Sequence, residues 1–203
     1  LTLDECVQLL DTVRNDTESA TKERDFAMIM LFLNCGMRLS ELVGINTTDI
    51  DREMKTLRLI GKGNKERVIY LNDACREALN AYFPVRSRQA EHLDPKDRRA
   101  LFLSSRRNQR ISQKTVQFVV YKYLDRAGFG NRKLSTHKLR HTAATLMYQN
   151  GGVDIRVLKD ILGHEQLNTT QIYTHVSDAS MQQAAENNPL SGFSAKKGNG
   201  EET

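Results

Sequence analysis

One apolar segment constrains the fold of this chain more than any other feature of its sequence. Residues 25–34 read DFAMIMLFLN, and Gly36 follows shortly after them. A membrane-spanning helix needs about 20 apolar residues, and no run in the 203 residues approaches that length. A short helix that is apolar on most sides belongs in a protein core, covered by other elements. We therefore predict a core helix over 25–34 that stops at Gly36, in a chain with no membrane partner.

The remaining sequence predicts more helices and one small antiparallel sheet. Thr2-Leu3-Asp4-Glu5 is a capping-box pattern that begins the first helix. Residues 55–60 and 67–71 alternate weakly around GKGNKE, as the strands of a β-hairpin do. Further helices are expected at 40–44, 72–82, 112–127, 136–149 and 153–162, with a short strand at 101–103 and a surface loop over 84–99. The expected fold class is mainly α with a small antiparallel β-sheet (α+β).

Length and charge indicate one domain with an anionic partner. We place this domain at residues 1–190 and expect the Gly-, Lys- and Glu-rich residues 191–203 to form a flexible tail. The net charge of +5 favours a polyanion. Three isolated cysteines without a CxxC pair argue against a disulfide framework and a zinc ribbon. We expect a cytoplasmic protein, with Cys35 as a buried structural thiol.

Groups that can act on a phosphate are concentrated in four short signatures: GMRLSEL, GKGNKER, HKLRH and LGHEQLNTTQIYTHV. They supply two guanidinium groups, an ammonium, two imidazoles and a phenol, carried by Arg38, Lys62, His137, Arg140, His164 and Tyr173. Guanidinium groups bind phosphate oxygens through paired N–H donors. A phenol has a pKa of about 10, so it becomes a nucleophile only when neighbouring groups help to remove its proton. This set is suited to hold a phosphate while a tyrosine attacks it.

These signatures resemble the active site of the tyrosine recombinase (phage integrase) family, in order and spacing across nearly the whole chain. The resemblance implies that family's catalytic-domain fold and a site-specific DNA recombinase or integrase. Such an enzyme cleaves and rejoins DNA through a 3′-phosphotyrosyl intermediate, without a cofactor. The wording of GKGNKER and LGHEQLNTTQIYTHV is most similar to Xer-type and mobile-element integrases. The implied partners are double-stranded DNA and other recombinase protomers, in a tetramer on two DNA sites.

The resemblance also implies a role for each residue of the site. Tyr173 is the nucleophile, and Arg38 and Arg140 clamp the phosphate as its charge grows in the transition state. Glu41 lies within helical reach of Arg38 and is assigned a supporting role that orients this guanidinium. Recombinases of this family usually carry an N-terminal helical domain that clamps DNA from the opposite side. That core-binding domain is expected to be absent from this chain, which begins directly with a helix signal.

The other three residues are expected to handle protons and bind the phosphate. His137 and Arg140 lie three positions apart at the start of a predicted helix, so they share one face. His137 is expected to take part in proton transfer or phosphate binding. Lys62, in the hairpin turn, is the expected general acid for the leaving 5′-oxygen, with Lys65 as the alternative. His164 is expected to donate a hydrogen bond to the phosphate.

A zinc site is the main alternative for the histidines. His137 and His141 have the HxxxH spacing of zinc helices, but Lys138 follows the first histidine where a metalloprotease has glutamate. Cations beside the pair also oppose a dication. We therefore expect no metal, and a zinc hydrolase would instead show stoichiometric metal and sensitivity to chelators.

DNA contacts beyond the site are expected from basic residues in or next to predicted helices, where they can approach backbone phosphates. They are Arg106, Arg107, Arg110, Lys114, Arg132, Lys133 and Lys138. Two other functions fit the same signatures. A type IB topoisomerase shares the chemistry but relaxes supercoils as a monomer. A catalytically silent DNA-binding regulator would keep the fold, although every catalytic position is occupied here.

Overall fold

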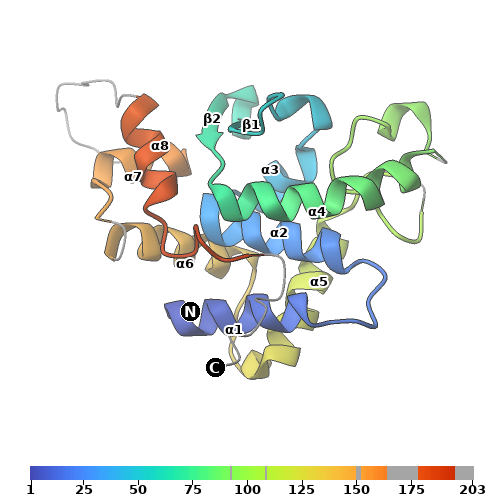
Figure 1. Cartoon of the computed structure of the whole chain (residues 1–203), viewed down its shortest axis with the longest axis horizontal. Coiled ribbons are helices and arrows are strands. Elements are labelled where there is room, and N and C mark those ends of the chain that lie inside the picture. Colours follow the sequence, from blue (N-terminus) through green and yellow to red (C-terminus); the bar gives the residue numbers. More distant parts are fainter. Residues whose placement is uncertain (92, 108, 150–151, 164–177, 195–203) are drawn as a thin grey trace, which may run out of the picture.

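The computed structural model describes residues 1–91, 93–107, 109–149, 152–163 and 178–194. The described residues form helices and one two-stranded sheet, which lies at the upper edge of the view in Figure 1. In chain order the main elements are α1 (Leu3–Arg14), α2 (Lys22–Cys35), α3 (Leu39–Gly44), β1 (Thr56–Ile60), β2 (Glu66–Tyr70), α4 (Asp73–Ala90), α5 (Gln113–Leu124), α6 (Thr136–Gln149), α7 (Ile155–Leu162) and α8 (Asp178–Glu186). None of the described helices is long and apolar enough to cross a membrane.

The predicted core helix is confirmed as α2, which packs against α1, α4 and α6 near the centre of the molecule (Figure 1). From Arg24 to Cys35 every residue of α2 is buried. Burying a large apolar side chain contributes about 1.5–3 kcal/mol, so this helix supplies much of the core. The predicted stop is also confirmed: Gly36 takes the left-handed conformation (φ 57°), and its N–H donates to the carbonyl of Phe32 over 3.1 Å.

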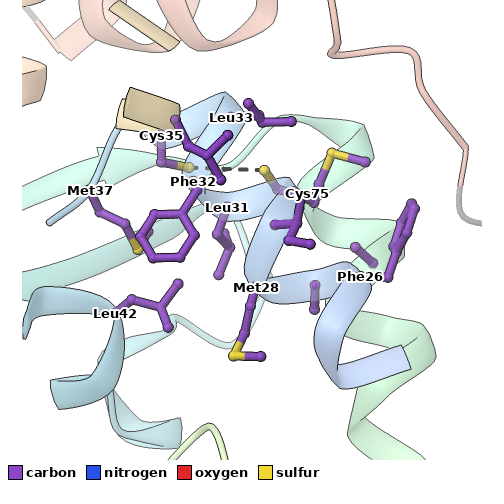
Figure 2. Packing of buried hydrophobic residues seen from close by; sticks show 14 of the residues in the cluster. Phe26, Met28, Leu31, Phe32, Leu33, Cys35, Met37, Leu42 and Cys75 are labelled. Atoms are coloured by element: carbon purple, nitrogen blue, oxygen red, sulfur yellow. Dashed lines mark hydrogen bonds between the residues drawn. The ribbon is translucent and has the colours of Figure 1, made fainter. Parts of the chain in front are cut away.

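Two of the cysteines meet inside this core. Figure 2 shows the Sγ atoms of Cys35 and Cys75 directed toward each other, 3.9 Å apart. Both thiols are free and buried. The hydrogen bond with Cys35, together with burial, raises the pKa of Cys75 well above its ordinary value. Cys35 itself is buried in the core and out of reach of solvent, so it is a structural thiol, as its apolar surroundings predict.

The predicted hairpin is confirmed as the antiparallel pair β1–β2, with a register from Thr56 opposite Tyr70 to Ile60 opposite Glu66. Leu57 and Leu59 are buried while the intervening side chain of β1 is exposed. This alternation is the ordinary pattern of a sheet with one face on the core. The connecting loop contains the short 3-10 turn Lys62–Asn64.

The prediction of a surface loop over 84–99 is wrong in its first part, because α4 continues through Pro84 to Ala90. Proline removes one helical hydrogen bond, but Pro84 lies on the exposed side, where water can satisfy the freed carbonyl. Tertiary contacts hold the helix beyond it. The buried Arg86 donates to the carbonyl of Ala100 from Nε (3.1 Å) and to that of Arg98 from Nη2 (2.5 Å).

Two further expectations are corrected by the structure. Residues 101–103 are buried but form no extended strand, and Leu103 makes only an isolated bridge with Arg110. The expected flexible tail does not begin at Ser191, because the N–H of Ala74 donates to the carbonyl of Ser191 over 3.0 Å. The Arg14 guanidinium then lies 4.7 Å from the centre of the Phe193 ring. Residues 195–203 lie outside the described part of the chain.

Candidate active site

The sharp turn at Gly36 places Arg38 at the start of α3, with Glu41 in the first turn of the same helix. The backbone N–H of Arg38 donates to Glu41 Oε2 over 2.6 Å, and its Nη1 donates to Oε1 over 2.9 Å. The side chain of Glu41 is fully buried, whereas that of Arg38 is 36% exposed. Arg38 is therefore held from the core side and remains open to an anion from solvent.

The second predicted clamp residue, Arg140, reaches the same place from α6. Its Nη1 donates to the carbonyl of Gly36 and its Nη2 to the carbonyl of Leu162, each over 2.6 Å. Burial, followed by the nearby positive charge of Arg38, lowers the pKa of Arg140 to about 10. This guanidinium is still charged at neutral pH, and a bound anion would relieve the repulsion between the two cations.

A third arginine, Arg67 of β2, joins the site and was not predicted to have a role. Its Nη1 and Nη2 donate to the two carboxylate oxygens of Glu41 over 2.5 and 2.8 Å, and its Nε donates to the carbonyl of Ile161 over 3.0 Å. A signal for it exists in the sequence. Arg67 lies two residues before the buried Ile69, so the period of a strand turns both side chains toward the core. An inward arginine needs a buried acidic partner.

The three arginines meet at the C-terminal end of α7. Arg67, Arg140 and Arg38 donate to three successive carbonyls, those of Ile161, Leu162 and Gly163. The last carbonyls of a helix have no partner within it and carry the negative end of its dipole, so these guanidinium groups cap the helix. We call Arg38, Arg67 and Arg140 the arginine cluster. It holds the chain directly before His164.

Glu41 is the only carboxylate that contacts the arginine cluster among the described residues. Burial by itself raises the pKa of Glu41, but hydrogen bonds from Arg67 and from the backbone of Arg38 outweigh it and lower this pKa to about 2. Glu41 is therefore ionised at neutral pH. Three guanidinium groups against one carboxylate leave a net positive charge, which suits an anionic ligand such as a phosphodiester.

Of the other predicted site residues, His137 and the backbone at Lys62 fall within the described chain. His137 is exposed in the first turn of α6, three residues before Arg140. The loop with Lys62 lies beside the arginine cluster, because a Cβ added to the preceding Gly61 would be 3.4 Å from Glu41 Oε1 and 3.9 Å from Arg38 Nη1. The side chain of Lys62, and all of His164 and Tyr173, lie outside the described residues.

Within the described part of the chain, the HxxxH pair has no third side chain placed to bind a metal ion. His137 and His141 are both exposed on α6. Over the described residues, no group of three or more histidine, cysteine, aspartate or glutamate side chains is placed to hold a metal ion. Zinc sites with histidine ligands generally take at least three protein ligands.

The predicted DNA-contact residues fall into different environments. Arg106, Arg107 and Lys114 are exposed around an open cavity of about 530 Å³ beside the N-terminus of α5. Arg110 differs from the prediction. Its guanidinium donates to the carbonyls of Val43 (2.8 Å) and Ile45 (2.9 Å) and to the side chain of Asn46, so this half-buried side chain is held by the end of α3 and the residues after it.

The remaining three predicted contacts are exposed near the start of α6. Arg132 pairs with Glu5 over 2.5 Å and stays 46% exposed. Lys133 lines the same surface hollow as Arg132, and Lys138 is exposed in the first turns of α6. Together with His137 they give this end of the helix a basic surface.

Comparison with known proteins identifies the family of the chain. The sequence pattern of the phage integrase family matches residues 1–180. The chain belongs to this family. Its mainly helical fold with an antiparallel pair of strands confirms the fold class predicted from the sequence.

Individual relatives are informative as well. The chain is 53% identical over 191 residues to the tyrosine recombinase XerC of Caldanaerobacter subterraneus subsp. tengcongensis, covering 94% of this chain and 51% of that protein. It is similar to the crystal structure of XerA recombinase (TM-score 0.69, 31% identity, 90% of this chain and 62% of that one). A similar fold occurs in the XerH site-specific recombinase bound to its difH substrate (TM-score 0.71, 27% identity, 92% and 53%). The chain spans about half the length of the curated relatives it matches.

Proposed function

We propose that this chain is the catalytic part of a site-specific DNA recombinase that cleaves and rejoins DNA through a 3′-phosphotyrosyl intermediate. One observation carries the proposal. Arg38 and Arg140, far apart in sequence, converge on the last carbonyls of α7 directly before His164. Family membership and the relation to the XerH structure with its DNA substrate support the same function.

The arginine cluster would supply the electrostatic part of this chemistry. Among the described contacts, Arg38 uses two of the five N–H donors of its guanidinium. Its remaining donors can bind the non-bridging oxygens of a DNA phosphate as their charge grows in the transition state. Because protein contacts already hold both clamp arginines, little reorganisation is needed when the phosphate arrives.

The covalent steps are assigned to Tyr173 and Lys62. The phenol of Tyr173 gives its proton to His137, and its oxygen attacks the phosphorus, so that a bond forms to the 3′-phosphate as the bond to the 5′-oxygen breaks. Lys62 gives a proton to the leaving 5′-oxygen, which becomes a free hydroxyl. Attack by the 5′-hydroxyl of a partner strand reverses these steps and releases Tyr173. The phosphoester is conserved, so exchange needs no external energy source.

DNA and further protomers are the proposed partners. Strand exchange between two sites needs a protomer for each strand, which corresponds to a tetramer on two duplexes. We propose that Arg106, Arg107, Lys114, Arg132, Lys133 and Lys138 contact DNA phosphates, and that the protein acts on DNA in the cytoplasm. The exposure of these side chains supports this assignment, whereas the internal bonds of Arg110 remove it from the set.

Covalent capture tests the proposed function. A DNA duplex nicked beside the cleavage site loses the short strand after attack, so protein should accumulate on DNA through Tyr173. The Tyr173→Phe variant keeps the ring but lacks the attacking oxygen, and it should bind DNA while forming no adduct. An undiminished adduct from Tyr173→Phe would remove the proposed nucleophile. Relaxation of supercoiled DNA without exchange between sites would favour a topoisomerase instead.

A further inference from the structure

We propose that Arg67 is a positioning residue of this active site. It couples the hairpin that carries Lys62 to Arg38 and to the end of α7, so that general acid, clamp and helix end keep one geometry. The inference rests on the proposed function, and it concerns a residue that does not need to touch the DNA.

The first observation is how Arg67 and Arg38 share Glu41. Oε1 accepts from Nη1 of both arginines, and Oε2 accepts from the backbone N–H of Arg38 and from Nη2 of Arg67. The carboxylate is fully buried and the Arg67 side chain is 14% exposed. A paired fork of this kind fixes the plane of a carboxylate, and the plane of Glu41 in turn sets the direction of the Arg38 guanidinium.

The second observation connects Arg67 to the end of α7. Besides the bond from its Nε to Ile161, Arg67 packs against Gly163, which has a left-handed backbone (φ 61°). A Cβ at Gly163 would lie 3.2 Å from Arg67 Nη1 and 3.3 Å from its Cδ. Arg67 therefore contacts the residue whose carbonyl accepts from Arg38 and which directly precedes His164.

The third observation is the place of Arg67 in the hairpin. It lies opposite Leu59, next to the closing pair Ile60–Glu66, so its anchor is at the base of the loop that contains Lys62. The loop itself approaches Glu41 at Gly61. A displacement of Arg67 would move the hairpin, the carboxylate and the helix end together.

A purely structural ion pair is the competing explanation. Replacing a buried pair as a whole is often neutral for stability, so stability alone does not separate the two roles. A lysine in place of Arg67 keeps the positive charge but lacks the paired N–H donors of a guanidinium. It cannot donate to Glu41 Oε1, to Glu41 Oε2 and to the carbonyl of Ile161 at the same time. A positioning role predicts slower cleavage at saturating DNA when Arg67 is replaced, whereas a purely structural ion pair predicts an unchanged cleavage rate in the folded variant.

The experiment compares Arg67→Gln and Arg67→Lys with a matched control in the full chain. The control is Arg58→Gln, because Arg58 on the neighbouring strand also pairs with a buried carboxylate, Asp49, over 2.7 Å, but on the outer side of the hairpin. Thermal unfolding and circular dichroism check the fold of each variant. Cleavage of nicked DNA is measured in single turnovers at saturating DNA, and affinity is measured separately.

Arg67→Gln is expected to cleave about 10- to 100-fold more slowly, since misplacement by about 1 Å can cost about 100-fold. DNA affinity should change by less than about twofold, because contacts of other basic residues with the DNA phosphates supply most of this affinity. Arg58→Gln should cleave like the wild type. Adding Glu41→Gln to Arg67→Gln should cost little more than Arg67→Gln alone, because both changes remove one coupled unit.

The pH profile provides a readout that a structural role would not move. Among the described side chains, Arg38, Arg67 and Arg140 are the charged groups that act on Glu41. Without Arg67, burial should raise the pKa of Glu41, so cleavage by Arg67→Gln should decline as acid protonates this carboxyl. Arg67→Lys should restore the wild-type pH profile but only part of the rate.

Two results would overturn the inference: a wild-type rate and pH profile in Arg67→Gln, or an equal loss in the Arg58→Gln control. If Arg67→Gln does not fold, Arg67→Lys decides the question, and an undiminished cleavage rate in Arg67→Lys would also overturn the inference. A wild-type chain that forms no adduct would instead contradict the proposed function. The coupling would then be decided by ¹³C NMR titration of Glu41, whose unchanged pKa in Arg67→Gln would refute it.

Discussion

At the scale of single residues, the proposed site depends on guanidinium groups that donate to protein carbonyls and would bind a phosphate at the same time. Arg140 bridges Gly36 and Leu162 from within the core, and Arg38 joins Glu41 to Gly163 at the surface of the site. Only arginine has enough N–H donors in one plane for both tasks. Charge alone is therefore not sufficient at either position.

Arg140→Lys is expected to lower the cleavage rate by about 100-fold or more, about 3 kcal/mol in the barrier. A lysine keeps the positive charge but cannot hold both carbonyls and a phosphate oxygen. DNA affinity should change little. Single-turnover cleavage of nicked DNA measures the effect, with Arg76→Lys as control, since Arg76 also donates to a carbonyl, that of Leu71, but outside the site. A near wild-type rate for Arg140→Lys would show that the clamp is assigned wrongly.

Lys62→Ala is expected to cleave ordinary DNA poorly and to recover on DNA with a sulfur in place of the bridging 5′-oxygen. A thiolate leaves without a proton, so a missing general acid no longer limits the reaction. Arg38→Ala should gain much less from this substrate, because Arg38 stabilises charge on the non-bridging oxygens.

Lys65→Ala is the comparison for the lysine assignment, and it should be milder than Lys62→Ala on both substrates. Rescue confined to Lys65→Ala would transfer the role of proton donor to Lys65. Equal rescue of the Lys62 and Arg38 variants would leave Lys62 as a DNA-contacting residue of the hairpin.

At the scale of elements, the site is built where helix ends meet. The end of α2, the start of α3, the first turns of α6 and the end of α7 all contribute backbone or side chains to the arginine cluster. Gly36 is central to this meeting, because its carbonyl accepts from Arg140 and a Cβ at its Cα would lie 2.8 Å from Cδ2 of Leu162.

Gly36→Ala is expected to destabilise the fold by about 1–2 kcal/mol from the left-handed backbone alone, and by more from the contact with Leu162. The melting temperature should fall by several degrees, and cleavage should slow because α2 and α7 separate around Arg140. Gly44→Ala is the control, since nothing lies within 4 Å of a Cβ at that position. An unchanged melting temperature for Gly36→Ala would mean that the turn tolerates a side chain.

At the scale of the whole molecule, the described chain is held in place on both sides of residues 164–177. The arginine cluster holds Gly163, and α8 packs on α7 and β2. Beyond α8, the buried Asn188 donates to the carbonyl of Leu33 over 3.3 Å, and Asn72 donates to Asn34 over 2.8 Å and to the carbonyl of Ala185. The chain after α8 is thus returned to the end of α2.

Metal independence is expected of the molecule as a whole, because guanidinium and ammonium groups take the place of a metal ion in stabilising phosphate charge. Excess EDTA should leave DNA cleavage intact. The measurement is adduct formation with and without chelator, followed by added zinc. A loss of activity that zinc restores would support the HxxxH interpretation of His137 and His141.

Local sequence determined most of the elements of this fold. Capping at Thr2, the apolar run of α2 with its glycine stop, and alternation in the hairpin depend on residues close together in the chain, so they can be read from short segments. The residues proposed to bind the phosphate could be named for the same reason, since each lies within one of the four short signatures.

The tertiary structure alone decided which partners these residues have. The role proposed for Arg67 depends on its hydrogen bonds to Glu41, 26 positions away, and to the carbonyl of Ile161, 94 positions away. Arg110 lies in a polar, basic stretch of sequence that predicts an exposed side chain, yet its guanidinium donates to the carbonyl of Val43 at the end of α3. Helix α4 continues past Pro84 because Arg86 donates to the carbonyl of Ala100, beyond the helix. Propensity and pattern act over a few residues, whereas the partner of a buried guanidinium depends on which distant segments packing brings together.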